Sequence, residues 1–77
     1  MTPEQIQNTF TYHAPHGNQT ERYENIRCHA RALAEVIAND APDSRERSVA
    51  LTNLQQCVMW ANAAIAINEQ PTPKAQQ

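Results

Sequence analysis

Apolar residues recur at alternating steps of three and four along two proline-free stretches of the chain, residues 18–41 and 43–70. In the first stretch, this stripe consists of Tyr23, Ile26, Ala30, Leu33 and Ile37. In the second stretch, it consists of Leu51, Leu54, Val58, Ala61 and Ile65. Such spacing gathers apolar side chains on one side of an α-helix. We therefore predict two amphipathic helices, each roughly 30 to 37 Å long at 1.5 Å per residue.

The residues that flank the two stripes indicate where each helix begins and ends. Asn18 or Thr20 is expected to cap the first helix, and Pro42 follows its end. A capping box at Asp43 predicts the start of the second helix, with Ser44 as the alternative cap. A connection this short forces the helices to run antiparallel. The predicted fold is all-α, an antiparallel helical hairpin with a short N-terminal segment.

The chain has 77 residues, which we interpret as a single helical-hairpin domain over residues 1–70. Residues 71–77 are polar and rich in proline, and are predicted to form a disordered tail. Cys28 and Cys57 both fall within helical patterns, and the polar N-terminus does not resemble a signal peptide. We expect free, buried thiols in a reducing compartment, the host cytoplasm, with a disulfide between the helices as the alternative.

The second predicted helix carries more apolar residues than a hairpin needs. A second apolar stripe lies beside the first and consists of Cys57, Trp60, Ala64 and Ile67. A helix that is apolar nearly all round is buried on more than one side. Burying another ~500 Å² at ~25 cal/mol per Å² contributes about 12 kcal/mol before entropy is counted. We therefore predict that the hairpin assembles into a compact homo-oligomer through this helix.

Charge and hydropathy narrow the choice of partners. The net charge of −2 argues against duplex nucleic acid, which is bound by broad basic surfaces. No apolar run approaches the ~20 residues that a membrane-spanning helix needs, so a membrane partner is not expected. An anionic ligand would have to be small and held by a few local cations.

Residues 10–27, FTYHAPHGNQTERYENIR, concentrate the groups that can hold such a ligand. They contain three of the four aromatic residues, two of the three histidines and the only glycine. Tyr12 lies in a predicted loop, where an exposed ring can stack on a nucleobase. The alternative is that Tyr12 and Phe10 plug the open end of the hairpin, which we favour for Phe10.

Tyr23, Arg27 and Arg31 are spaced i, i+4, i+8 and share one edge of the first helix. An aromatic ring beside two guanidinium groups suits a base and its phosphate. The alternative interpretation is a tyrosine at the edge of the core with two arginines balancing Glu24 and Glu35.

Other chemistry has little support in the sequence. His13 and His16 form an H-x-x-H pair without the further ligands that a zinc site needs, so neither a metal nor another cofactor is expected. No nucleophile, base and acid can be assembled, and we predict that the protein is not an enzyme. Asn62 is the one polar residue within 60–67, WANAAIAI. It either fixes the packing register or faces a ligand cavity.

Three blocks, FTYHAPHGNQTERYENIR, APDSRERS and MWANAAIAIN, resemble phage anti-defence proteins that sponge cyclic nucleotides. These small helical hairpins block cyclic-oligonucleotide-based antiphage signalling (CBASS), and the resemblance covers about residues 9–68. It implies a homohexamer that captures cyclic dinucleotides, such as cyclic GMP–AMP, without cleaving them. It also implies a separate site for cyclic trinucleotides in at least some members.

The resemblance assigns roles to single residues. The base-stacking tyrosine falls on Tyr12, and the basic residue that holds the phosphate falls on Arg27, where relatives may carry lysine. Family members often end in AIARN, whereas this chain reads AIAIN, with Ile67 in the basic position. Near the trinucleotide site, His13 and Asn68 remain as candidates.

The expected ligand sites combine these observations. The residues assigned to the cyclic dinucleotide are Tyr12, Arg27, His13, Tyr23 and Arg31. Asn62 and Asn68 are assigned to a possible second site. The alternative function is a small helical homo-oligomer that docks a host protein through the apolar face of its second helix.

Overall fold

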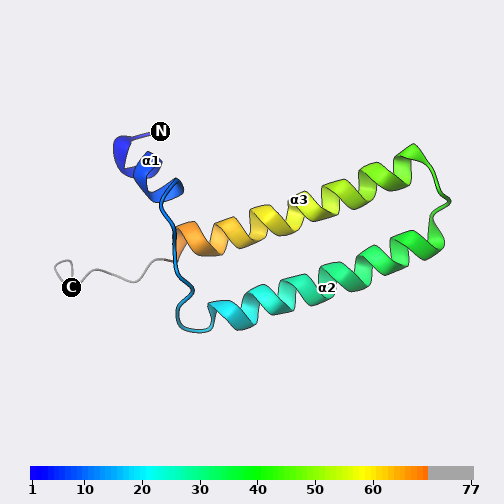
Figure 1. Cartoon of the computed structure of the whole chain (residues 1–77), viewed down its shortest axis with the longest axis horizontal. Coiled ribbons are helices and arrows are strands. Elements are labelled where there is room, and N and C mark those ends of the chain that lie inside the picture. The colour runs from blue at the N-terminus through cyan, green and yellow to red at the C-terminus, as the bar shows by residue number, and fades with distance from the viewer. Residues whose placement is uncertain (70–77) are drawn as a thin grey trace.

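The computed structural model describes residues 1–69, which form three helices (Figure 1). They are α1 (Pro3–Thr9), α2 (Gln19–Asp40) and α3 (Arg45–Asn68). Helices α2 and α3 run antiparallel, and α1 lies beside the C-terminal end of α3 (Figure 1). No strand occurs in this part of the chain. The predicted all-α hairpin is confirmed, whereas its assembly into an oligomer stays a prediction, and the predicted 71–77 tail lies outside the described residues.

The starts of the two long helices differ in detail from the sequence patterns. Asn18 precedes α2, but its side chain makes no capping bond and instead accepts a hydrogen bond from Arg22 Nε at 3.1 Å. Ser44 caps α3, and its hydroxyl accepts from the backbone N–H of Arg47 at 3.1 Å. The predicted capping box at Asp43 is therefore wrong. Its carboxylate contacts the Arg47 guanidinium at 3.2 Å.

The short helix α1 was not predicted, although its sequence carries a clear signal. The hydroxyl of Thr2 accepts the N–H of Gln5 at 3.1 Å, and the Gln5 side chain accepts the N–H of Thr2 at 2.8 Å. This reciprocal pair is a capping box, and Pro3 occupies the first helical position, where its missing N–H costs nothing. The pattern TPEQ therefore starts a helix in a segment that carries no long apolar stripe.

The two long helices contact each other through the predicted stripes, yet one chain does not bury them. Ile26, Ile37, Leu54 and Val58 are half-buried, and Leu33 is 49% exposed. Within residues 1–69, no apolar side chain is fully buried. A single hairpin therefore forms a thin ribbon that has no closed core.

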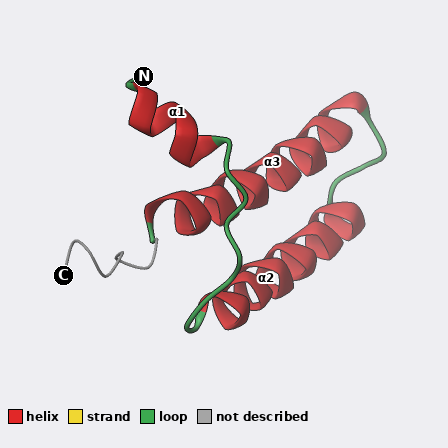
Figure 2. Cartoon of the chain, turned by 60° about the vertical axis from the view of Figure 1, so that its left-hand side comes forward, coloured by secondary structure: helices red, strands yellow, loops and turns green. Residues whose placement is uncertain are grey.

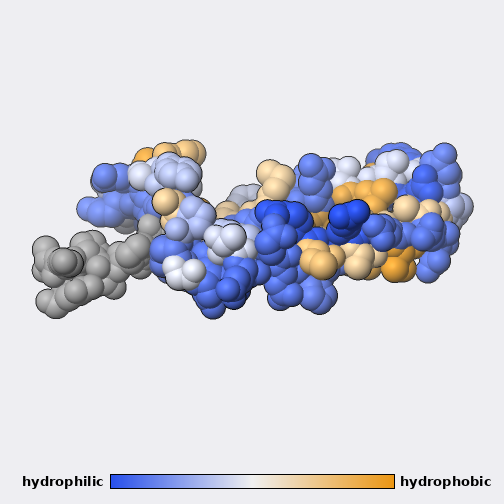
Figure 3. Space-filling view, turned by 60° about the horizontal axis from the view of Figure 1, so that its bottom comes forward, coloured by the Kyte–Doolittle hydropathy of each residue, from blue (hydrophilic) through white to orange (hydrophobic). Residues whose placement is uncertain are grey.

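The second apolar stripe of α3 lies largely on the surface. Trp60 is 75% exposed, Cys57 and Ala64 are exposed, and Ile67 is half-buried. Met59, beside this stripe, is 62% exposed, and apolar side chains emerge between polar ones along the hairpin (Figure 3). Cys28 and Cys57 are free, as predicted, but both are exposed in the single chain rather than buried. No helix in residues 1–69 combines the length and the apolar character needed to cross a membrane.

Candidate functional site

The segment that joins α1 to α2, residues 10–18, runs past the C-terminal end of α3 (Figure 2). We call it the aromatic loop. The last carbonyl groups of a helix have no partner within the helix and must be satisfied from outside. Asn8, at the end of α1, donates from Nδ2 to the carbonyl of Ile67 at 2.9 Å. His13 in turn bonds through Nε2 to the carbonyl of Asn8 at 2.6 Å. The aromatic loop is thus fastened at its start to the end of α3.

A glutamine fastens the far side of the same loop. Within residues 1–69, Gln19 is the one buried residue, only 3% exposed. Its Oε1 accepts the backbone N–H of His16 at 3.1 Å, and its Nε2 donates to the carbonyl of Glu69 at 3.2 Å. The ring Nε2 of His16 bonds to that same carbonyl. A buried amide left unpaired costs about 1–3 kcal/mol, so this position needs a side chain that both donates and accepts.

Two further features complete this end of the molecule. Gly17 has a φ of 57°, a left-handed conformation that glycine adopts at low cost, and it turns the chain into α2. Arg22, on α2, makes a two-pronged ion pair with the Glu69 carboxylate, in which one N–O distance is 2.9 Å. We call His16, Gln19, Arg22 and Glu69 the latch.

The ion pair changes the acid–base behaviour of both partners. The hydrogen bond from Arg22 holds the pKa of Glu69 below its ordinary value of 4.5, with Gln19 and His16 contributing less. The same hydrogen bond raises the pKa of the Arg22 guanidinium. The charged forms of Arg22 and Glu69 therefore stabilise each other.

Tyr12 projects from the aromatic loop and is 83% exposed, and Phe10 is 80% exposed. Neither ring plugs the end of the hairpin in the single chain. The packing role that we favoured for Phe10 is therefore wrong for the single chain. His13 is half-buried, and one of its ring nitrogens is occupied by the bond to Asn8. Tyr12 therefore presents an open ring on a backbone that is held from both sides.

The basic edge of α2 lies farther along the hairpin. Arg27 pairs with Glu24, and Arg31 Nε lies 3.4 Å from Glu35, so both predicted balancing acids are present. Tyr23 is half-buried. Exposed ion pairs contribute only about 0–1 kcal/mol, so an incoming phosphate can replace either carboxylate.

Arg27 and Arg31 line one groove between α2 and α3, of about 360 Å³, together with Met59 and Gln55. Tyr12 is not among the residues that line it. Arg27 lies eight positions after Gln19, the first residue of α2, which corresponds to about 12 Å along the helix. The structure therefore brings the two cations together on one groove and leaves the stacking ring at the end of the molecule.

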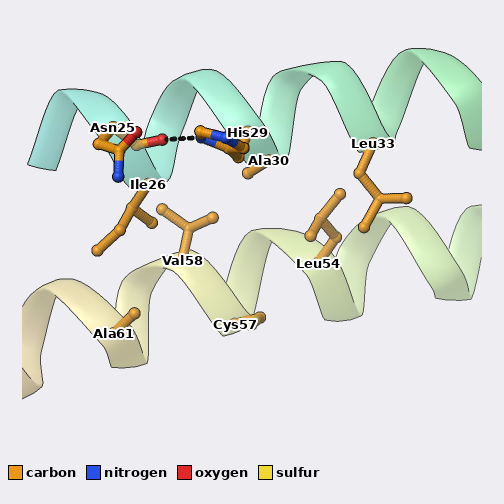
Figure 4. A pocket seen from close by; sticks show the side chains of 9 residues that line it. All are labelled: Asn25, Ile26, His29, Ala30, Leu33, Leu54, Cys57, Val58 and Ala61. Carbon is orange, nitrogen blue, oxygen red and sulfur yellow. Dashed lines mark hydrogen bonds between the residues drawn. The ribbon is translucent and has the colours of Figure 1, made fainter. Parts of the chain in front are cut away.

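A second groove, of about 400 Å³, lies between the same helices (Figure 4). It is lined by Asn25, Ile26, His29, Ala30, Leu33, Leu54, Cys57, Val58 and Ala61. His29 points along its own helix, and its Nδ1 bonds to the carbonyl of Asn25 at 2.8 Å (Figure 4). Leu54 and Val58 border both grooves. The two grooves are lined by different edges of α2 and therefore lie on opposite faces of the hairpin. Both faces of the hairpin are therefore open.

The two asparagines assigned to a second site differ in what they contact. The Oδ1 atom of Asn62 is buried and has no hydrogen-bond partner among residues 1–69. Asn68 is exposed, and its Nδ2 donates to the carbonyl of Ala64 at 2.9 Å. Asn62 thus keeps an unsatisfied acceptor, whereas Asn68 is engaged with its own helix.

Sequence reasoning missed Asn8, Gln19, Arg22 and Glu69 as residues that shape this end of the molecule. Their partners lie 47 to 59 residues away in the chain, so no local period signals the contacts. In the described part of the chain, no group of three His, Cys, Asp or Glu side chains lies close enough to hold a metal ion.

An open aromatic ring on a hydrogen-bonded loop and two arginines on a separate groove are typical of a small helical binding protein. Comparison with known families agrees with this class. The family model described as Acb2/Tad1, hairpin domain, matches residues 2–66, which is most of the chain. The chain belongs to this family, the anti-CBASS sponges, as the sequence resemblance predicted. These are binding proteins that are not known as enzymes. No curated protein and no solved structure matches the chain.

Proposed function

We propose that this protein sequesters cyclic dinucleotides, such as cyclic GMP–AMP, in the host cytoplasm without cleaving them. Stoichiometric binding would lower the free messenger below the level that activates a host effector. The observation that carries the proposal is Tyr12, 83% exposed on a hydrogen-bonded loop in a chain of the anti-CBASS sponge family. An open ring held in place is suited to stacking on a base.

Assembly supplies what one chain lacks. Tyr12 and the Arg27 groove lie apart in one hairpin, and Trp60 is 75% exposed on α3. A homohexamer built through α3 would cover this apolar surface and bring two copies of each group together. An isologous interface presents the same groups twice, which matches a ligand that is close to twofold symmetric.

The expected contacts supply part of the free energy of binding that a sponge needs. Stacking contributes about 1–3 kcal/mol per base, and each phosphate can replace Glu24 as the partner of Arg27. Nanomolar affinity corresponds to roughly −12 kcal/mol. Arg31 extends the same basic edge, and Tyr23 and His13 support the two elements that carry the ligand contacts. Because the net charge of the chain is −2, only a small anion held by a few local cations is expected to bind.

A cyclic trinucleotide site is the finer part of the proposal. The unpartnered Oδ1 of Asn62 can accept a hydrogen bond, and Asn68 lies six residues, about 1.7 turns, further along α3. Ile67 places an apolar side chain where relatives often carry a basic one. We therefore expect trinucleotides to bind more weakly than dinucleotides.

Calorimetry against a panel of cyclic di- and trinucleotides tests the proposal. Tyr12→Ala and Arg27→Ala should each weaken dinucleotide binding strongly while the oligomeric state remains, and Tyr12→Phe, which keeps the ring, should bind nearly as tightly as the parent. Recovery of intact ligand after denaturing the complex would show that nothing is cleaved. If both alanine variants bind as tightly as the parent, the site assignment is wrong.

The exposed Trp60 also favours the second candidate function, docking of a host protein through α3. Under that function, changes at Leu54 or Trp60 would abolish binding of the host protein. Calorimetry with cyclic GMP–AMP separates the two functions, because only the sponge binds it. A stable monomer in size-exclusion chromatography with light scattering would also contradict the sponge proposal.

A further inference from the structure

The aromatic loop is held in place almost wholly by polar contacts. Its two large rings, Phe10 and Tyr12, are at least 80% exposed among residues 1–69, so they contribute little to holding it. Its fixed points are the bonds of His16 and Gln19 to the Glu69 carbonyl, and the bonds of Asn8. The conformation that presents Tyr12 therefore depends on a few directional bonds.

We infer that the latch formed by His16, Gln19, Arg22 and Glu69 positions Tyr12, so that ligand affinity depends on side chains away from the stacking ring. This inference rests on the proposed function. The latch residues are positioning residues, because they act on the ligand through the loop. Tyr12 precedes His16 by only four residues, so the latch limits how far the backbone of Tyr12 can move.

Gln19 is the centre of the latch because it joins the loop to α3 through one side chain. Its Oε1 accepts the N–H of His16, and its Nε2 donates to the carbonyl of Glu69. Leucine would fill similar space but make neither bond. Glutamate would bring a negative oxygen against a carbonyl oxygen and near the Glu69 carboxylate.

Arg22 does not contact the loop through its ion pair and acts through Glu69 instead. Glu69 follows α3 directly as its C-cap, and its carbonyl accepts the bonds from both His16 and Gln19. The two-pronged pair between Arg22 and the Glu69 side chain ties that residue to α2. The carbonyl is thereby held where His16 and Gln19 can reach it.

The expected consequence is a loss of affinity without a loss of the site. If the loop samples other conformations, the apparent affinity falls by the fraction that remains competent to bind. We expect Gln19→Leu to lower cyclic dinucleotide affinity about tenfold, which corresponds to about 1.4 kcal/mol. The control is Asn39→Leu, a change from an amide to leucine at an exposed position near the other end of α2, which should leave affinity unchanged.

A double-mutant cycle separates positioning from general destabilisation. If the latch acts through Tyr12, Gln19→Leu should cost nothing further in a Tyr12→Ala background, measured with cyclic GMP–AMP at concentrations that still give a signal. An equal loss in both backgrounds would overturn the inference. Reversing the ion pair gives a rescue test: Arg22→Glu should weaken binding several-fold, and adding Glu69→Arg should restore part of it.

Hydrogen exchange of the ligand-free protein tests the latch independently of any ligand. Gln19→Leu should raise exchange at the amides of residues 11–18 and leave the middle of α2 and α3 unchanged. Unchanged loop exchange, or faster exchange throughout the hairpin, would contradict a local latch. If the parent binds no cyclic nucleotide, the proposed function fails, and this exchange result alone decides whether the latch orders the loop.

Discussion

The middle of the hairpin and its loop end are held together by different kinds of contact. Between α2 and α3, apolar side chains such as Leu54 and Val58 meet but stay half-exposed, and open grooves run along both faces. At the loop end, the one buried residue of the described chain is a glutamine, surrounded by hydrogen bonds and an ion pair. The apolar region is incomplete by itself, whereas the polar region is already satisfied.

The two regions therefore have different roles: apolar contacts stabilise the protein, and hydrogen bonds fix the position of the loop. Apolar burial is non-directional and scales with area, so an unfilled surface favours a further copy of the same helix. Hydrogen bonds are directional and modest in net free energy, so they define a shape more than they stabilise it. We therefore expect assembly to govern stability and the latch to govern ligand affinity.

The largest effect should come from placing a charge on the exposed apolar face. Trp60→Asp would require an unpaired carboxylate to be buried on assembly, which costs several kcal/mol. We expect light scattering to show monomers instead of oligomers, with a lower melting temperature. Trp60→Phe keeps an apolar ring and should still assemble. An unchanged oligomer in the aspartate variant would show that α3 is not the assembly surface.

A smaller effect should follow from trimming the contact between the helices. Leu54 borders both grooves, and Leu54→Ala should lower the free energy of unfolding by about 2 kcal/mol in urea titrations. Thr52 is exposed on the same helix, so Thr52→Ala should stay within about 0.5 kcal/mol of the parent. Equal losses in the two variants would mean that the stripe contact does not support the hairpin.

Acid should weaken the loop end before it affects the apolar contact. Because the pKa of Glu69 is lowered from 4.5 by Arg22, the stabilisation is complete above that value and is lost as the pH falls through the folded-state pKa. The NMR signals of the Gln19 side-chain amide should shift in that range below pH 4.5. Glu69→Gln should lack this transition, and its persistence there would assign the transition to another group.

The smallest effect should come from freeing a cation on the ligand groove. Glu24 pairs with Arg27, so Glu24→Gln removes a competitor of the incoming phosphate. Because an exposed pair contributes about 0–1 kcal/mol, we expect calorimetry to show binding up to about fivefold tighter. Glu21→Gln provides the control, because Glu21 does not pair with Arg27 and its loss should leave the affinity unchanged. Weaker binding in the Glu24 variant would indicate that this carboxylate contacts the ligand directly.

The local pattern of the sequence was enough to predict most of the fold. The three–four stripes predicted α2 and α3, and the short link predicted their antiparallel course. The start of α3 could only be narrowed to Asp43 or Ser44, because both side chains can cap a helix. In the structure, the Ser44 hydroxyl is the cap. The helix α1 was missed although Thr2 and Gln5 form its capping box, because that segment has no apolar period.

The sequence alone was enough to predict the two long helices and the excess of apolar surface on α3, because both follow from spacing that repeats within a few residues. The candidate groups Tyr12 and Arg27 came from the aromatic and basic residues gathered in one segment and from the family resemblance. Only the tertiary structure decided that Glu69 receives His16, Gln19 and Arg22, and that a glutamine is buried where the loop meets α3. Those contacts join residues about fifty positions apart, and whether they form depends on how the chain folds back on itself rather than on any local pattern.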